Sequence, residues 1–100
     1  MAATPEARVK AKIKKILTAH DVYYAMPIGS AFGNSGVPDF LCCVQGRFLA
    51  IEAKANGNKP TALQLKHIKT IQEARGCALV VDETNLGALE LLIQTLKESR

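Results

Sequence analysis

The sequence lacks any Cys-x-x-Cys pair among its three cysteines, so it has no spacing typical of a cysteine-ligated zinc site. Cys42, Cys43 and Cys77 all fall in apolar, strand-like runs, and their odd number favours reduced, buried thiols in a cytoplasmic protein. The sequence also lacks an apolar run long enough to span a membrane and a signal-peptide pattern at its charged start. These absences disfavour a membrane protein and a secreted disulfide scaffold.

Several familiar functional patterns are absent as well. There is no helix-turn-helix or zinc-finger signature, and no arrangement of Ser, His and Asp or of Cys and His that would support a nucleophile. His20 and His67 stand alone, and we expect both to be structural or surface residues. No repeat, low-complexity segment or linker divides the 100 residues, so we expect one domain over residues 1–100.

What the sequence does have is enough apolar material for one core. Hydrophobic residues make up 48% of the chain, and a domain of this size can fold without disulfides. The formal net charge is +4 and the pI is about 9.1. A basic balance of this kind permits a polyanionic partner such as nucleic acid without requiring one.

A β-hairpin is predicted where two apolar runs flank Gln45-Gly46. If these two residues form the loop, pairing outward from it places Asp39 opposite Glu52 on one face of the sheet, and Lys54 shares that face. Gln-Gly is a poorer two-residue loop than Asn-Gly or Asp-Gly. A bulge with a left-handed Gly46 would shift the register by one residue and separate the pair, so both registers remain open.

Two carboxylates held opposite each other repel, and something must offset that cost. A protonated partner, the ammonium of Lys54 or a bound divalent cation could each do so. Hard cations such as Mg²⁺ take oxygen ligands and often only one or two carboxylates. Asp39, Glu52 and Lys54 therefore suggest a metal site with an ammonium beside it. The alternative is an ordinary surface strand with salt bridges.

The remaining elements follow from capping residues and apolar spacing. A first helix opens at Thr4-Pro5 and ends at His20-Asp21. Because both faces of the hairpin are apolar, we expect helices above and below the sheet. Between the first helix and the hairpin we predict a strand over Val22–Met26 and a loop over Pro27–Gly36. A second helix should run from Thr61 to about Ala74 and stop at Gly76, with an apolar stripe of Leu63, His67, Ile71 and Ala74. A buried strand over Cys77–Val81 and a last helix should follow, and the stripe of that helix is Leu86, Leu89, Leu92, Ile93 and Leu96.

Two features each have two readings. The first-helix lysines (Lys10, Lys12, Lys14 and Lys15) form either a solvated face or a patch for phosphates. The small residues of the Pro27–Gly36 loop form either a plain connector or a cradle for a sugar-phosphate backbone.

At the hairpin the chain resembles a known superfamily. Pro38-Asp39 followed by Glu52-Ala53-Lys54 matches the Pro-Asp…(Asp/Glu)-x-Lys pattern of the restriction-endonuclease-like nucleases. The lead-in Gly36-Val37-Pro38-Asp39-Phe40 is similar to that of the VRR-NUC family, the virus-type replication-repair nucleases. The likeness runs from about Glu6 to Val81. It implies an α/β fold with a restriction-endonuclease-like core, the order α-β-β-β-α-β-α, and a mixed central sheet flanked by helices on both faces.

The resemblance also implies a function and a set of site residues. It implies a Mg²⁺-dependent DNA endonuclease, with Mn²⁺ as a substitute, in which Asp39, Glu52 and the carbonyl of Ala53 bind the metal. Lys54 would act in catalysis. The resemblance also places the Gln64 amide in the active site, whereas its spacing from Thr61 is that of a capping box, and the two roles could hold in different states. Glu6 either supplies a third acid or serves only as a first-turn acid of its helix. The residues expected to contact nucleic acid are Asn34, Ser35, Gly36 and Lys59.

The resemblance implies branched DNA such as a Holliday junction as the substrate, because stand-alone members of the family look like junction-resolving enzymes of phage or bacteria. We therefore expect the protein in the cytoplasm of a bacterium or of a phage-infected host. Cutting two symmetric strands calls for two active sites, and a homodimer is the simplest way to provide them. The leucine stripe of the last helix is a candidate for the dimer interface. The competing use of that stripe is to cover the protein's own sheet. Lys59-Pro60-Thr61 departs from the acidic or Arg-Leu-Ser-like segment of many relatives, which leaves substrate preference open. The alternatives are a basic binding module that does not cut and a duplex-cutting nuclease of the same superfamily.

Overall fold

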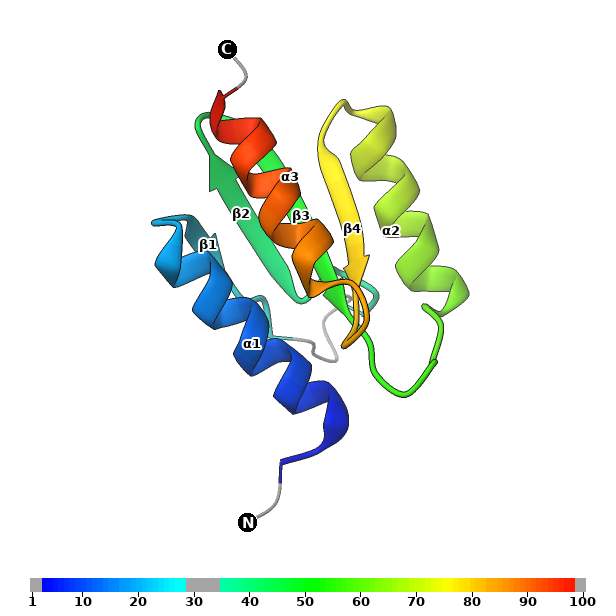
Figure 1. The fold of residues 1–100 in the computed structure, drawn as a ribbon. Coiled ribbons are helices and arrows are strands. Elements are labelled where there is room, and N and C mark those ends of the chain that lie inside the picture. Colours follow the sequence, from blue (N-terminus) through cyan, green and yellow to red (C-terminus); the bar gives the residue numbers. More distant parts are fainter. Residues whose placement is uncertain (1–2, 29–34, 99–100) are drawn as a thin grey trace.

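The computed structural model describes residues 3–28 and 35–98, which fold in the order predicted from the sequence. Three helices and four strands alternate as α-β-β-β-α-β-α, and Figure 1 shows their arrangement. The elements are α1 (Pro5–Ala19), β1 (Tyr23–Ala25), β2 (Phe40–Val44), β3 (Arg47–Ala53), α2 (Ala62–Glu73), β4 (Cys77–Val81) and α3 (Leu86–Glu98).

The four strands form one mixed sheet in the order β1-β2-β3-β4. β1 pairs with β2, and β2 with β3, in antiparallel fashion, whereas β3 and β4 are parallel. Parallel neighbours need a crossover, and α2 provides it between β3 and β4. The mixed α/β sheet expected from the sequence is confirmed.

The β2–β3 hairpin has the two-residue loop and not the bulge. Val44 pairs with Arg47, and the register continues to Phe40 opposite Ile51. Gln45 and Gly46 have φ angles of 51° and 81°, so both loop residues are left-handed. That combination gives a type I′-like turn, whose twist matches the flanking strands. The register that places Asp39 and Glu52 on neighbouring strand ends is therefore the one the chain adopts.

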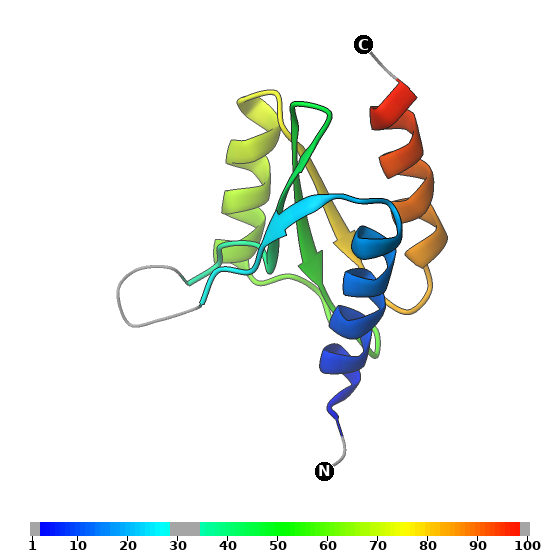
Figure 2. The ribbon, with the colours of Figure 1, turned by 90° about the vertical axis from the view of Figure 1, so that its left-hand side faces the viewer.

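The sheet lies between two helical layers. Figure 2 shows α1 and α3 on one face and α2 on the other. The apolar stripes of α1 and α3 meet one face of the strands in a single core, made by Val9, Ile13, Leu17, Phe40, Cys42, Val44, Leu49, Ile51, Ala53, Val81, Leu89, Ile93 and Leu96, among others. The leucine stripe of α3 thus covers its own sheet, while Leu91 stays 64% exposed.

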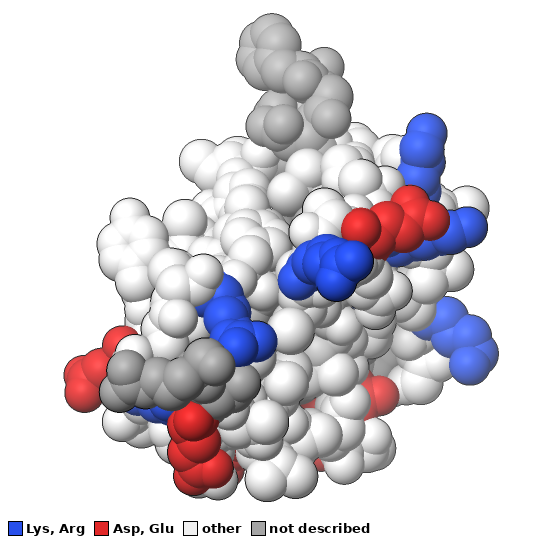
Figure 3. Space-filling model, turned by 90° about the horizontal axis from the view of Figure 1, so that it is seen from above, with Lys and Arg blue, Asp and Glu red and all other residues white. Residues whose placement is uncertain are grey.

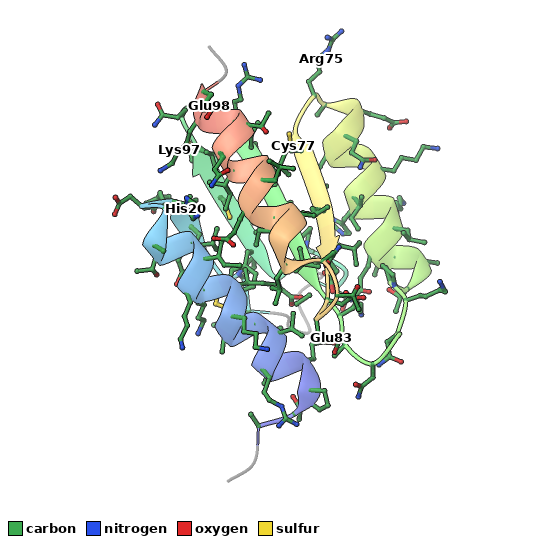
Figure 4. The ribbon with its side chains drawn as sticks, in the orientation of Figure 1. His20, Arg75, Cys77, Glu83, Lys97 and Glu98 are labelled. Atoms are coloured by element: carbon green, nitrogen blue, oxygen red, sulfur yellow. The ribbon has the colours of Figure 1, made fainter. Side chains whose placement is uncertain are left out.

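His20 joins α1 to α3. It caps the C-terminal end of α1, and Figure 4 shows it beside Lys97 near the end of α3. The Lys97 ammonium donates a hydrogen bond to the His20 carbonyl oxygen, and Nε2 of His20 lies 3.2 Å from Oε2 of Glu90. These contacts fix the two helices against each other at the end of α1 opposite its N-terminus.

The face of α2 that meets the sheet differs from the predicted stripe. Ile68 is its buried residue, at 9% exposure, while Leu63 is 44% exposed and Ala74 is also exposed. The predicted stripe is displaced because Leu63 and His67 face the turn before β2, where Gly36 lies against them.

The helix also stops in a different way from the one expected at Gly76. Arg75, with φ of 73°, is the left-handed residue after the C-cap Ala74. Gly76 is needed for a different reason: a Cβ at this position would lie 2.9 Å from Cγ2 of Ile71. The prediction that the helix stops at this position is correct. The glycine is required for close packing against Ile71 and not for a positive φ.

The second face of the sheet is only partly covered. Across it, Tyr23 pairs with Cys43 and Cys43 with Phe48. Tyr23 is 77% exposed, Phe48 is 43% exposed and Cys43 is exposed as well. The expectation of three buried thiols was wrong for Cys43, because α2 packs on β4 and leaves this part of β2 open, and Cys77 is only half-buried.

Figure 3 views the end of the molecule that lies at the top of Figure 1. Lysine and arginine side chains lie close to acidic ones there, beside a wide uncharged area. Within the described parts of the chain, no helix is both long and apolar enough to cross a membrane.

Candidate active site

The proposed site residues gather at the lower end of the sheet in Figure 1. There β2 begins directly after Asp39, and β3 ends with Glu52 and Ala53. The first turns of α1 lie at the same end. Three segments far apart in the sequence therefore bring polar side chains to one place.

Asp39 is held from two sides. Its Oδ2 accepts a hydrogen bond of 2.8 Å from the backbone N–H of Ala53, and its Oδ1 lies 3.4 Å from the Lys10 ammonium. The Asp39 side chain remains 21% exposed. The bond to Ala53 fixes the carboxylate against the end of β3, beside the next residue back, Glu52.

Glu52 is buried to an unusual degree for an acid, with 2% of its surface exposed. Its Oε2 lies 3.7 Å from the Lys54 ammonium, and its Oε1 has no hydrogen-bond partner among the described residues. Burial and the neighbouring charge of Asp39 raise the pKa of Glu52 from 4.5 to about 7, although the Lys54 charge opposes the rise. The positive charge near Glu52 is therefore too small to offset the cost of burying its carboxylate as an anion.

Lys54 follows β3 and turns its ammonium back toward Glu52. Its side chain is only 11% exposed. Its backbone N–H donates a 2.9 Å hydrogen bond to the carbonyl of Val81, which ties it to the end of β4. This bond fixes the backbone of Lys54 beside the site, and the low exposure of its side chain limits the positions that the ammonium can take. The structure therefore brings together Asp39, Glu52 and Lys54.

Lys10 also belongs to this site and was not assigned to it from the sequence. Its ammonium lies between Oδ1 of Asp39, at 3.4 Å, and Oε2 of Glu6, at 3.7 Å. The Glu6–Lys10 spacing of four residues is a readable helix pair. The contact with Asp39 depends on how α1 docks on the sheet, which no local pattern reveals.

Glu6 reaches the site through Lys10. Its charge also contributes, as a lesser cause, to the raised pKa of Glu52. Within residues 3–28 and 35–98, no three His, Cys, Asp or Glu side chains are close enough to hold a metal ion together. The role of Glu6 as a third acid stays a prediction.

Comparison with known proteins supports a fold assignment. No protein-family model matches the sequence, and no curated protein matches it. A solved structure titled "VRR_NUC domain" aligns with a TM-score of 0.68 and 24% identity, over 96% of this chain and 97% of that one. The chain has the fold of a VRR_NUC domain. The resemblance drawn from the Pro38-Asp39 and Glu52-Ala53-Lys54 motifs is thus confirmed in the fold.

Gln64 occupies a structural position in this VRR_NUC fold. Its Oε1 accepts a 2.8 Å hydrogen bond from the N–H of Thr61, and its own N–H donates to the Thr61 hydroxyl at 3.2 Å. This is a complete capping box at the start of α2. A catalytic role for Gln64 would require the side chain to leave the cap, and that role stays a prediction.

Of the residues expected to contact nucleic acid, Ser35, Gly36 and Lys59 lie outside the helices and strands. Asn34 lies outside the described residues, and Ser35 is exposed in a turn. Gly36, with φ of 84°, packs so closely on α2 that a Cβ there would lie 2.7 Å from Cγ of Leu63. Lys59 is exposed in the connection between β3 and α2. Their contacts with nucleic acid stay predictions.

The oxygen atoms of the candidate site fit a hard divalent cation. Asp39 and Glu52 supply carboxylate oxygens, which such cations prefer. Oε1 of Glu52 is a buried acceptor without a partner among the described residues, and buried polar groups of that kind call for an explanation. A cation would satisfy this oxygen and would lower the raised pKa of Glu52.

Proposed function

We propose that the chain is a metal-dependent nuclease that hydrolyses DNA at the Asp39–Glu52–Lys54 site. The observation that carries this proposal is the buried Glu52 carboxyl, which has one oxygen without a partner among the described residues and a pKa raised to about 7 beside a second acid. Such an arrangement costs stability, and perturbed acids of this kind cluster at functional sites. The solved structure with the VRR_NUC fold, whose title denotes a nuclease domain, supports the same conclusion.

Asp39 and Glu52 would hold Mg²⁺, with Mn²⁺ as a substitute and the Ala53 carbonyl as a further ligand. The bound cation would polarise the scissile phosphate and lower the pKa of a coordinated water. The hydrogen bond from the Ala53 N–H to Asp39 keeps one carboxylate oriented before the ligand arrives. This preorganisation limits the entropy cost of binding.

Lys54 supplies the positive charge on the protein side of the reaction. Its ammonium lies 3.7 Å from Glu52, is nearly buried, and can orient a water molecule or stabilise charge developing on the phosphate. A nearly buried ammonium acts more strongly on such charge than one in bulk water. Gln64 would help to position water or phosphate, and Glu6 would supply a third acid from α1.

Branched DNA is the substrate that we propose for this nuclease. Selection by DNA shape needs only phosphate contacts and a fixed geometry, whereas base readout needs elements that enter a groove. A four-way junction has two equivalent strands to cut, so a C2 homodimer is the simplest active form. Because the α3 stripe covers its own sheet, the dimer surface would lie elsewhere.

The proposal is tested by incubating the purified chain with junction, flap and linear duplex DNAs, with Mg²⁺ or with EDTA. We expect cutting of branched DNA that requires the metal and is abolished in Asp39→Asn. Asp21→Asn is the matched control, since it makes the same change at an exposed loop residue away from the site. Equal cutting by wild type and Asp39→Asn would overturn the proposal, and binding without cutting would favour a non-catalytic binding module.

A further inference from the structure

The excess positive charge of this protein is concentrated on one helix. α1 carries five basic side chains and a single acid, a net charge of +4, which equals the net charge of the whole chain. The rest of the chain has eight basic and eight acidic residues and is therefore balanced. A polyanion approaching the molecule would be drawn toward α1.

A shallow, open hollow of about 460 Å³ lies along the same helix, beside β1. Its lining residues are Lys14, Lys15, Thr18, Ala19 and Tyr24, none of them acidic. Among the described residues, no carboxylate lies within 4.0 Å of the Lys14 or Lys15 ammonium group. Figure 2 faces this side of the molecule, with β1 in front of the sheet and α1 next to it.

The hollow contains both kinds of group that bind a nucleic-acid strand. Two lysines and a threonine hydroxyl can contact phosphates, and Tyr24 contributes an aromatic wall. The ring of Tyr24 is held by Phe40, with the ring centroids 5.7 Å apart. A positively charged groove with aromatic side chains is typical of surfaces that follow a single strand.

One face of α1 runs from the candidate active site to the hollow. Lys10, Lys14 and Thr18 are spaced four residues apart and share one face of α1. Lys10 contacts Asp39 at the site, and Lys14 and Thr18 line the hollow. At 1.5 Å per residue, Lys10 and Thr18 are roughly 12 Å apart along the helix axis. That span corresponds to roughly three to four nucleotides at 3.4 Å each.

We infer that the α1–β1 hollow binds the DNA strand next to the bond that is cut, with Lys14 and Lys15 on its phosphates. This inference rests on the proposed nuclease function and adds the path of the strand. The strand passes from the Asp39–Glu52 site over Lys10 and along α1 to Tyr24. Contacts with phosphates would position the strand without reading its sequence.

The test compares two double variants of the full-length chain that remove the same charge. Lys14→Ala/Lys15→Ala removes the lysines of the hollow, and Lys66→Ala/Lys69→Ala removes two exposed lysines from α2 on the other face of the sheet. Fluorescence anisotropy with a labelled junction DNA in EDTA gives the Kd at several salt concentrations. Thermal unfolding checks that both variants remain folded.

We expect the α1 variant to bind at least about tenfold more weakly. Its salt-dependence slope should fall by roughly 1.8, or about 0.9 for each phosphate that a lysine no longer neutralises. The α2 variant should keep the wild-type slope. Equal weakening and equal slopes in the two variants would overturn the inference, even if the wild type cuts DNA. If the wild type binds through α1 and yet never cuts, the proposed function fails, and DNA binding by the α1–β1 hollow stands without its relation to a cut bond.

Discussion

The ammonium of Lys10 lies 3.4 Å from Oδ1 of Asp39, and this contact joins the first helix to the start of the second strand. Lys10 places a positive charge beside one of the two acids proposed to hold a metal. In the metal-free protein it offsets part of the repulsion between the acids. If a divalent cation binds there as proposed, the same ammonium would be an unfavourable neighbour for it.

Replacing Lys10 by methionine should therefore tighten metal binding. Methionine keeps much of the side-chain stem and removes the charge that repels the cation. For a partly exposed charge at this distance, we expect a gain of roughly 0.5–1 kcal/mol, or about two- to fivefold in Kd for Mn²⁺. Calorimetric titration of the protein with Mn²⁺, in the absence of DNA, measures this Kd. Lys12→Met, at an exposed position of the same helix, is the control and should leave the Kd unchanged.

The stability of the metal-free protein should fall as pH rises from about 4.5 to about 7. Glu52 has a pKa of about 7 in the folded state against 4.5 for the free group, so the folded state binds more protons over this range. Below pH 4.5 the carboxyl is protonated in both states, and above pH 7 its burial as an anion costs about 3 kcal/mol. Denaturant unfolding at pH 5 and pH 8 measures the difference.

Glu52→Gln should remove this component of the pH dependence. The variant should be more stable than the wild type at pH 8 without metal, and saturating Mg²⁺ should stabilise the wild type far more than the variant. Glu73→Gln, at an exposed position of α2, should behave like the wild type. A wild-type pH profile that Glu52→Gln leaves unchanged would mean that this carboxyl is not the titrating group.

The two residues of the α2 capping box should separate stability from catalysis. Thr61→Ala removes the hydroxyl that accepts the Gln64 N–H and should cost about 1 kcal/mol. Gln64→Ala should cost a similar amount and also slow DNA cutting, because its amide is predicted to position water or phosphate. Cutting rates well below the melting temperature provide the comparison. If both variants cut at the wild-type rate, Gln64 acts only as a cap.

Gly76→Ala should destabilise the fold. The added Cβ would lie 2.9 Å from Cγ2 of Ile71 and 3.2 Å from Cδ2 of Phe48, and such overpacking costs roughly 1–3 kcal/mol. Gly87→Ala is the contrasting change, because a Cβ there meets nothing within 4 Å inside α3. It should stabilise the protein by roughly 0.5–1 kcal/mol. Thermal melts that rank the two variants the other way would contradict the packing described here.

The hairpin and its acids were predictable because they depend on local rules. A two-residue loop fixes the register, and strand alternation then places Asp39, Glu52 and Lys54 at one sheet end. The contact of Lys10 with Asp39 and the exposure of Cys43 were not predictable in this way. Both depend on where α1 and α2 dock on the sheet, and that is set by the packing of the whole core.

The α2 stripe shows the same limit within one helix. Leu63, His67 and Ile71 have the spacing of a buried face, but the helix turns Ile68 toward the sheet and Leu63 toward the turn at Gly36. Periodicity identifies the helix and its caps, since those depend on neighbours in the sequence. It does not identify which of two adjacent apolar stripes meets the sheet.

The most direct test is a crystal structure of the protein grown with Mn²⁺ and measured for anomalous scattering. We predict one strong anomalous peak within roughly 2 Å of a carboxylate oxygen of both Asp39 and Glu52, including the oxygen of Glu52 that has no hydrogen-bond partner among the described residues. The same experiment on Asp39→Asn should show a much weaker peak or none. Saturating Mn²⁺ with no peak between the two acids of the wild type would contradict the account.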